Sequence, residues 1–405
     1  MRTVPFFFDT FPKSRRPEYP RQRGELRTRV LIVGGGLTGV SCALSFATAG
    51  VQVTLIEADR IGADATAGSA GLLRQDFDAS FQETASRYGL RAARHLWQAI
   101  RRSSLDFAAA IRRLGIRCDL APQDLLLFTR DGADAARRLT REYQARRDAG
   151  LDVTRLTAAA LKRDAAIAGD AAIRTRGDAF DPYRASVGLA SAAAERGAVI
   201  HERTRARRVR AGRKTVQVKT EAGVITADAV VIATGAPIED LRALRRHFVA
   251  HETYAVVTES LPAAVRRQMG RRAAALRDTD SPPHLLRWMK DDRVLFAGAD
   301  QPPTPARARS KTLMQRSGQL MYELSTLYPA ISGLQPEWTW SLTHHTSVDE
   351  LPLVGLHRNF PRHLFALGHG RHGAGVAWLS ARVLVRAFLG NPAKGDDLFG
   401  FSRIL

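Results

Sequence analysis

The sequence predicts an α/β fold in which one domain is built on a parallel sheet. Three observations lead to this prediction. A buried strand, a glycine-rich turn and a helix follow one another near residue 30, a second buried strand ends in Thr-Gly near residue 235, and a strand–turn–helix unit lies close to the end of the chain. Strands that alternate with helices in this way are typical of parallel sheets.

The first unit is RVLIVGGGLTGVSCALSFATAGVQVTLIEADR, residues 29–60. Val30–Val33 is a short run of β-branched and leucine residues, as expected of a buried parallel strand. A helix is predicted over Thr38–Ala49, and Gly50 ends it before a second strand over Val51–Glu57. Strand, glycine turn, helix and strand in this order indicate a Rossmann-like dinucleotide-binding unit.

The G-x-G-x-x-G turn and the acid after the second strand each have a physical role in holding a dinucleotide. Gly34 makes the tight turn, Gly36 lets a pyrophosphate approach the backbone, and Gly39 permits close packing of helix and strand. Glu57 accepts the ribose hydroxyls, and an acid at this place argues against a 2′-phosphate. The helix N-terminus faces the phosphates. The residues assigned to the cofactor here are Gly34, Gly36, Leu37, Thr38, Gly39, Glu57 and Ala58.

A second strand, within EAGVITADAVVIATGAP at residues 221–237, is predicted over Ala229–Ala233. It ends in Thr234-Gly235, which we assign to the cofactor because chains with a flavin-type dinucleotide fold return to the sheet at this point. This unit favours a flavin over a nicotinamide dinucleotide.

The stretch GHGRHGAGVAWLS, residues 368–380, follows a short strand at Leu364–Leu367 and opens a helix that continues to about Leu389. Binding of a nicotinamide dinucleotide does not require this additional turn and helix N-terminus. In a reduced flavin, negative charge develops at the N1–C2 carbonyl edge, and a helix N-terminus stabilises it through free N–H groups and the helix dipole. We interpret this turn as the seat of the reduced ring, formed by Gly370, Arg371, His372 and Gly373.

With these motifs the chain resembles the D-amino-acid oxidase-like flavoproteins, also called the glycine oxidase or FAD-dependent oxidoreductase family. The resemblance runs from residue 28 to residue 403 and rests on the glycine motif, TAGSAGLL (66–73), VVIATGAP (230–237) and DELPLVGLHRNFPRHLFALGHGRHGAG (349–375). It implies an FAD cofactor, a Rossmann-like FAD-binding domain and a discontinuous mixed-sheet substrate domain.

The resemblance also assigns residues to the cofactor. In the family, the strand matching Arg205–Val209 passes the adenine, which points to Ala206, and the loop matching Thr66–Leu73 lines the flavin phosphates and ring. Some members attach FAD through a histidine in that loop or a cysteine near the C-terminal turn. Here the loop has no histidine and the cysteines lie elsewhere, so non-covalent FAD is implied. The loop residues assigned are Thr66, Ser69, Ala70, Gly71 and Leu72.

The domains that follow from this interpretation are discontinuous. Residues 1–24 form an N-terminal arm packed on the body of the protein. The FAD-binding domain takes residues 25–75, 181–240 and 350–405, and the substrate domain takes residues 76–180 and 241–349. Helical periodicity is expected over 76–117, a helix begins after Asp181-Pro182, and alternating strands are expected within 247–300.

Substrate recognition departs from the family pattern. Amino-acid members carry W-x-G-x-R-P shortly before P-D-G-x-P-x-x-G, and the arginine clamps the substrate carboxylate. This chain has WTWSLTHHTSVDELPLVG, with His344 where the arginine is expected and Glu350 in place of a glycine. Arg287 and Arg371 are the nearest replacements by position in the sequence.

Histidines and a tyrosine on the predicted strands are further candidates for the substrate site. His344 and His345 together could sense protonation or hydrogen-bond a polar substrate. His251, Tyr254 and His284 lie on segments that face the flavin in relatives, although each could equally be a core or rim residue. Adjacent histidines on a strand point to opposite faces, so no metal site is expected.

Composition limits the protein's environment and partners. The 405 residues carry a formal net charge of +21, lysine occupies only seven positions, and the arginines are scattered along the chain, which favours a solvated basic surface over a nucleic-acid site. No apolar run approaches a membrane span and no secretory leader is evident at the N-terminus. Two cysteines offer no disulfide framework, so we expect a cytoplasmic protein.

The function predicted is an FAD-dependent oxidoreductase that oxidises a C–N bond of a small amine or amino acid by hydride transfer to flavin N5, with oxygen or a quinone as electron acceptor. Two alternatives stay open. One is a flavoenzyme acting on a modified base of transfer RNA, and the other is a flavin-binding, electron-relay subunit without turnover of its own.

Overall fold

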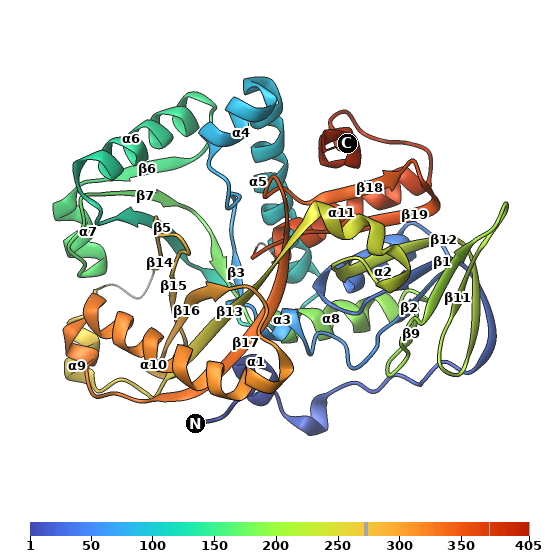
Figure 1. The fold of residues 1–405 in the computed structure, drawn as a ribbon, viewed down its shortest axis with the longest axis horizontal. Helices are drawn as coiled ribbons and strands as arrows, with labels where there is room; N and C mark the ends of the chain where they lie inside the picture. The colour runs from blue at the N-terminus through green and yellow to red at the C-terminus, as the bar shows by residue number, and fades with distance from the viewer. Residues whose placement is uncertain (271–273, 372, 405) are drawn as a thin grey trace.

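The computed structural model describes residues 1–270, 274–371 and 373–404, and two eight-stranded sheets organise it (Figure 1). Sheet 1 has the strand order β10-β11-β12-β1-β2-β9, with β19 beside β12 and β18 beside β19. Its strands are β1 Gly24–Val33, β2 Val53–Ile56, β9 Val199–His201, β10 Arg208–Ala211, β11 Val216–Lys219, β12 Gly223–Gly235, β18 Leu353–His357 and β19 Phe360–Leu367.

Sheet 2 has the order β17-β13-β16-β15-β14-β5-β7-β6. Its pairs are antiparallel except β14 with β5, so the sheet is mixed. Its strands are β5 Asp124–Thr129, β6 Val153–Leu156, β7 Ala171–Thr175, β13 Phe248–Thr258, β14 Ala274–Asp278, β15 Leu285–Trp288, β16 Val294–Gln301 and β17 Pro336–Ser347. A three-stranded sheet adds β3 Leu72–Leu73, β4 Ala121–Pro122 and β8 Asp178–Ala179.

The parallel core of sheet 1 arises from the apolar strands seen in the sequence. β1 pairs in parallel with both β12 and β2, and β12 pairs in parallel with β19. Val30 and Ile32 belong to the core on one face and Leu31 and Val230 to the core on the other, and all four are fully buried, so both faces of the sheet are covered. The carboxyl ends of β1, β12 and β19 therefore lie side by side, each followed by a glycine turn.

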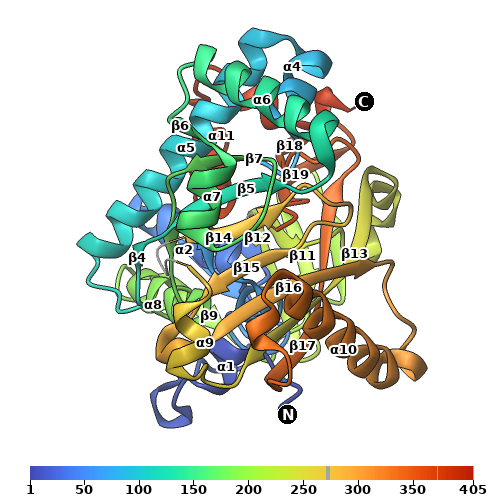
Figure 2. The ribbon, with the colours of Figure 1, turned by 90° about the vertical axis from the view of Figure 1, so that its left-hand side faces the viewer.

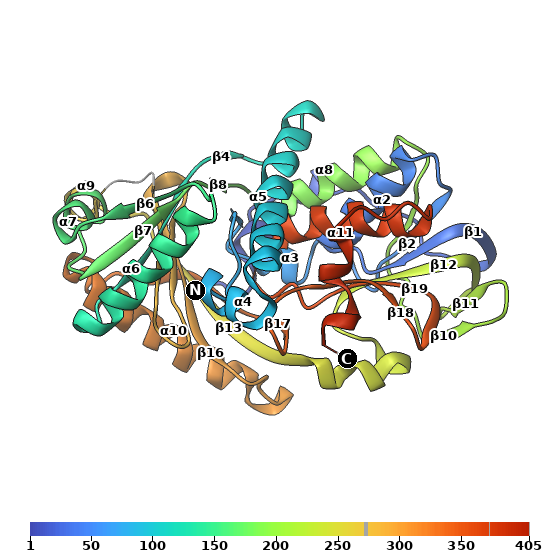
Figure 3. The same ribbon diagram turned by 90° about the horizontal axis from the view of Figure 1, so that it is seen from above.

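Helices cover sheet 1 on one side, as Figure 3 shows. α2 (Leu37–Thr48) lies between α8 (Pro182–Ala194) and α11 (Gly373–Phe388), and α11 also contacts α5 (Leu90–Arg113). The helix expected over 76–117 is divided in two, because Gly89 with φ +81° ends α4 (Phe81–Tyr88) before α5 begins.

Around sheet 2, α10 (Arg309–Leu327) packs on β13, β16 and β17. At the other edge of the sheet, α6 (Gly132–Asp148) and α7 (Ala158–Ala165) pack on β6 and β7 (Figure 2). α9 (Ala263–Arg267) is a short connecting helix, and α3 (Ala65–Gly68) contacts β17. None of the helices in the described ranges is long and apolar enough to cross a membrane.

The N-terminal arm packs on the body as the sequence suggests. α1 (Phe6–Asp9) contacts α3 and α8. Arg2 exchanges backbone hydrogen bonds with Glu337 and Thr339 at the edge strand β17, both at 2.8 Å. The strands of sheet 1 fall within 24–57, 199–235 and 353–367, and those of sheet 2 within 124–175 and 248–347. The exact domain boundaries stay a prediction.

Candidate functional site

The glycine turn after β1 is built by backbone contacts. Gly34 has φ +109°, and a Cβ there would lie 2.6 Å from the Ala233 carbonyl oxygen of β12. A Cβ on Gly39 would overlap the carbonyl oxygen of Gly34 itself. Gly39 lets the first turn of α2 approach the turn after β1, and Gly34 lets that turn pass close to β12. Gly39 therefore serves helix–strand packing, whereas the Cβ position of Gly36 faces Thr66 Oγ1 at 3.2 Å.

Glu57 follows β2 and lies beside this turn. Its Oε2 accepts a hydrogen bond from Gly35 N at 2.6 Å, and its Oε1 accepts one from Asp59 N at 2.8 Å. Burial raises the pKa of this carboxyl, while the two backbone donors partly offset the effect. An ionised carboxylate has about four acceptor sites, so two remain for other donors.

A cavity of about 500 Å³ begins at this turn and continues to sheet 2. Most of the predicted cofactor residues line it. They are Gly34, Gly36, Leu37, Thr38, Glu57, Ala58, Thr66, Ser69, Ala70, Gly71, Leu72, Ala206, Thr234, Gly235, Gly370, Arg371 and Gly373. Gly39 is not in the lining, and His372 lies outside the described residues.

The loop from Thr66 to Leu72 is fixed from both sides of the cavity. Thr66 Oγ1 accepts a hydrogen bond from Leu37 N at 2.9 Å, which joins the loop to the start of α2. Trp340 Nε1 of β17 donates to Gly68 O at 2.9 Å. The loop therefore connects the glycine turn of sheet 1 with the edge strand of sheet 2.

Arg287 fixes the same loop through hydrogen bonds to its backbone carbonyls. Its Nη1 donates to the carbonyl oxygens of Ala70, Gly71 (2.6 Å) and Phe180 (3.0 Å), and its guanidinium lies over the Phe7 ring, 5.4 Å from the centroid. Burial lowers the pKa of Arg287 to about 10. Since its Nη1 is engaged by these carbonyls and the residue is absent from the described lining, Arg287 is not placed to clamp a substrate carboxylate.

The closing turn joins α2 and α11 through a residue that sequence reasoning overlooked. His369 Nδ1 lies 3.0 Å from Thr38 Oγ1, and its Nε2 lies 3.2 Å from Ser380 Oγ. Gly370 has φ +56°, which explains the glycine. Gly373 needs no such explanation, because its φ is ordinary and a Cβ there would meet nothing within 4 Å. Its open side faces the cavity.

Histidines form part of the wall that sheet 2 contributes. His344 and His345 of β17 both line the cavity, and the His251 ring stacks on His344 with centroids 5.3 Å apart. Burial lowers the pKa of His344 to about 3, and burial also lowers the pKa values of His345 and His251. These imidazoles are therefore neutral at pH 7.

Three arginines line the cavity beside these histidines: Arg277 of β14 in sheet 2, Arg371 in the turn after β19, and Arg74 directly after β3. Arg371 pairs with the buried Asp300, and Arg277 of β14 pairs with Asp78 at 3.1 Å. Arg74 lines the cavity too and shares Asp78. Sequence reasoning missed Arg74 and Arg277, since neither lies within a motif and Arg277 is placed by the pairing of β14 with β5 and β15.

The remaining candidates differ in position. Tyr254 is buried, its hydroxyl lies 3.0 Å from Thr304 Oγ1 and accepts from Gln301 Nε2 at 2.9 Å, and it is absent from the described lining. His284 lines the cavity, but its two ring nitrogens face Asp278 and Glu323. Tyr254 therefore fits the core role, whereas His284 belongs to a carboxylate cluster in the wall.

Comparison with known proteins identifies what this arrangement resembles. A sequence model of the family described as "FAD dependent oxidoreductase" matches residues 29–387. The chain is 25% identical over 374 residues to gamma-glutamylputrescine oxidoreductase of Escherichia coli (strain K12), covering 91% of this chain and 85% of that protein. It is 28% identical over 389 residues to glycine oxidase of Geobacillus kaustophilus, covering 93% and 96%.

Solved structures share the fold. The crystal structure of glycine oxidase from Geobacillus kaustophilus superposes with a TM-score of 0.78, at 21% identity over 94% of this chain and 100% of that chain. L-proline dehydrogenase from P. horikoshii gives a TM-score of 0.76, at 20% identity over 93% and 97%. The α/β fold with a Rossmann-like domain and a mixed-sheet domain is thereby confirmed.

The residues around the cavity fit FAD. At the glycine turn, Gly34 and Gly39 bring backbone and helix start together without a side chain between them. Glu57 keeps acceptor sites for ribose hydroxyls, and Gly373 leaves open space where α11 begins. The first residues of α2 and α11 also line the cavity, where the free N–H groups of a helix N-terminus would suit a phosphate or an anionic ring edge.

Proposed function

Because the chain belongs to the FAD-dependent oxidoreductase family, we propose that it oxidises the C–N bond of a small amine or amino acid. Bound FAD supplies at its N5 atom the acceptor for the hydride that leaves the substrate carbon. The observation that carries this proposal is the continuity of the cavity. Gly34 and Glu57 line it from sheet 1 and His344 lines it from sheet 2, so a dinucleotide held at the turn after β1 shares one cavity with the side chains of sheet 2.

The wall of sheet 2 suits an amine substrate. His344 and His345 are neutral at pH 7, and Arg277 and Arg371 are cationic. The carboxylates Asp300 and Asp78 are already paired with these arginines, and the neutral imidazoles offer no counter-charge to an ammonium, so the wall favours the unprotonated amine. Its nitrogen lone pair assists departure of hydride from the neighbouring carbon, and water hydrolyses the resulting imine. The chain's contribution is orientation and charge, so no dedicated general base is assigned.

We infer that FAD is bound without a covalent link. Burial raises the pKa of the Cys42 thiol to about 12, and burial raises that of Cys118 to about 12 as well. Both thiols are therefore protonated at pH 7, and neither lines the described cavity. Acid or heat treatment of the purified yellow protein is expected to release FAD into solution. Flavin that stays with the precipitated protein would contradict this.

The proposed reaction is tested by anaerobic bleaching of the flavin absorbance against a panel of amines and amino acids. We expect at least one amine or amino acid to bleach it, with a carbonyl product and free ammonia or amine. Readmitting oxygen or adding a quinone then identifies the acceptor. A flavin that dithionite reduces but no amine reduces would instead support the electron-relay alternative.

A further inference from the structure

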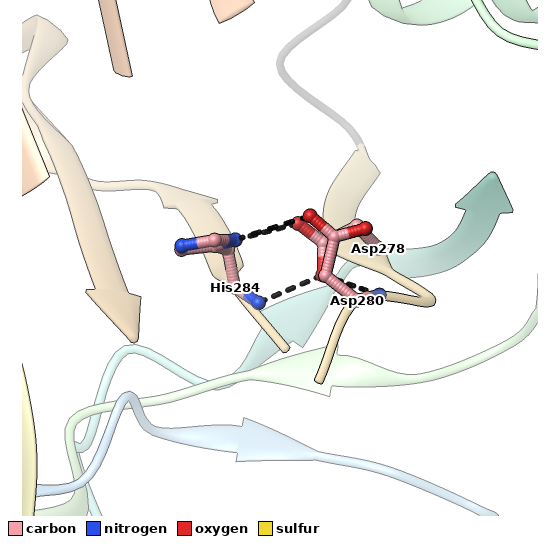
Figure 4. Close-up of side chains that lie close together, drawn as sticks. All are labelled: Asp278, Asp280 and His284. Carbon is pink, nitrogen blue, oxygen red and sulfur yellow. Dashed lines mark hydrogen bonds and ion pairs between the residues drawn. The ribbon is translucent and has the colours of Figure 1, made fainter. Parts of the chain in front are cut away.

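We propose that the turn between β14 and β15 binds a divalent metal ion, with Asp278, Asp280 and His284 as its protein ligands (Figure 4). Each residue offers one ligand atom, and these atoms all lie within 4.8 Å of one another. His284 Nδ1 lies 2.7 Å from Asp278 Oδ2 and 3.9 Å from Asp280 Oδ2. The two carboxylates thus face the same ring nitrogen.

The turn itself brings these atoms together. Asp278 is the last residue of β14, Asp280 lies in the turn, and His284 comes directly before β15. Asp278 Oδ1 accepts backbone hydrogen bonds from His284 N at 2.8 Å and from Asp280 N at 3.3 Å. With this oxygen occupied, Asp278 presents its other oxygen to the imidazole. The ligand set is therefore local and needs no rearrangement of the sheets.

Residues outside the turn, which are not themselves ligands, orient the imidazole of His284. His284 Nε2 lies 3.1 Å from Glu323 Oε2 of α10. The ring also stacks on Phe296 of β16, with centroids 5.4 Å apart and planes inclined by 5°. A metal-binding histidine typically gives its second ring N–H to a carboxylate, which fixes the tautomer and leaves the other nitrogen for the metal. Glu323 occupies that position.

Charge balance favours a divalent cation. A second cavity, of about 250 Å³, adjoins the cluster, and the charged groups among its described lining residues are Asp278, Asp280, Glu323 and Arg130, besides His284. Three carboxylates and one guanidinium leave a charge of −2 around a neutral imidazole. A divalent ion on Nδ1, in place of a proton, neutralises it. The adjoining cavity has room for the waters that complete the coordination.

Two carboxylate oxygens and one imidazole nitrogen suit Zn²⁺ better than Mg²⁺ or Ca²⁺, which prefer oxygen ligands alone. Pro283, His284 and Leu285 also line the large cavity, so the ion would lie in the wall between the two cavities. The expectation of no metal site rested on the adjacent pair His344 and His345. The site proposed here uses a different histidine.

The test uses untagged holoprotein freed of metals with a chelator and titrated with Zn²⁺ in a calorimeter. We expect one ion per chain. Asp280→Asn is the mildest ligand variant, because this side chain is 37% exposed, and it should weaken Zn²⁺ binding at least tenfold. His284→Gln should weaken it further. Asp134→Asn, which changes an exposed carboxylate at the start of α6, should bind like the wild type.

Glu323 is a positioning residue in this scheme, and a second measurement separates its role from general stability. Glu323→Gln should weaken Zn²⁺ binding about tenfold while its metal-free melting temperature stays near that of the wild type. Zn²⁺ should raise the melting temperature of wild type and Asp134→Asn but not of His284→Gln. Absence of stoichiometric Zn²⁺ binding to the wild type would overturn the proposal. Zn²⁺ affinity as high as that of the wild type in Asp280→Asn and His284→Gln would overturn it as well.

Discussion

The two ends of the large cavity are held by different kinds of contact. At the end formed by β1 and α2, backbone meets backbone, and the Cβ positions of Gly34 and Gly39 are already filled by carbonyl groups. At the end formed by sheet 2, charged side chains meet one another, as Arg371 does with Asp300 and Arg277 with Asp78. The glycine turn depends on positions that carry no side chain, whereas the wall near sheet 2 depends on the side chains that line it.

This difference has a chemical consequence. A backbone site recognises what every member of a cofactor class shares, namely phosphate and ribose, and tolerates almost no change of residue. A wall of side chains can be altered one residue at a time while the sheets stay in place. The variants below are therefore expected to act most strongly at the backbone end and most selectively at the wall.

The largest effect is expected from Gly39→Ala. The added methyl group would overlap the Gly34 carbonyl oxygen, which is backbone and cannot move aside, so the loss of stability should reach or exceed the upper end of about 1–3 kcal/mol seen for overpacked sites. Gly373→Ala is the matched control, since it also opens a helix but meets nothing within 4 Å. Chemical denaturation of both variants decides the point. Equal stability would mean that the helix start is not packed as described.

Arg287 should give the next largest effect, on cofactor retention. Arg287→Leu removes the donors to Ala70, Gly71 and Phe180, and hydrogen bonds to a charged group contribute about 1.5–3 kcal/mol. We expect a higher FAD dissociation constant, measured by flavin fluorescence, and a smaller increase in melting temperature on adding FAD. If acids and amines lose affinity while FAD binding is unchanged, Arg287 acts on substrate after all.

These two positions show what could be predicted from the sequence. Gly39 and Glu57 lie in a motif whose spacing reflects local geometry, so their neighbours follow from the chain itself. The positions of Arg287 and Arg277, in contrast, depend on contacts between segments that are far apart in the sequence. The strand of Arg277 pairs with β5 and β15, and the Arg287 guanidinium lies over Phe7 of the N-terminal arm. Position in the sequence suggested Arg287 and Arg371 as clamps; Arg371 lines the cavity together with Arg277, whereas Arg287 is buried beneath the loop and is absent from the described lining. His369 was overlooked because its partners, Thr38 and Ser380, come from two separate helices.

The wall is tested by Arg371→Gln and Arg277→Gln. If either guanidinium binds a substrate carboxylate, its loss should cost about 1.5–3 kcal/mol, seen as a KM more than tenfold higher for acids and little changed for neutral amines. The corresponding lysine variants keep the charge and should recover part of the affinity. KM values that rise alike for acids and amines would show that neither arginine anchors a carboxylate.

A further effect is expected in the pH dependence of stability, and His344 produces it. Burial, together with the nearby Arg371, His251 and His345, lowers its pKa in the folded protein to about 3, although Asp78 opposes this shift. The unfolded chain binds a proton near pH 6.5, so the stability contributed by neutral His344 is fully present above pH 6.5 and is lost as the pH falls toward 3.

The His344→Asn variant lacks this loss of stability at acidic pH. The free energy of unfolding, measured by denaturation between pH 6.5 and the acid limit of the folded state, should fall less steeply in the variant, by at most about 1.4 kcal/mol per pH unit. His363→Asn is a useful comparison, because burial also lowers the pKa of His363, which lies in β19 away from the described wall; replacing it should flatten the curve too, without involving the cavity. Parallel curves for wild type and His344→Asn would show that His344 already accepts a proton in the folded wall, and the neutral character assigned to that end of the cavity would fail with it.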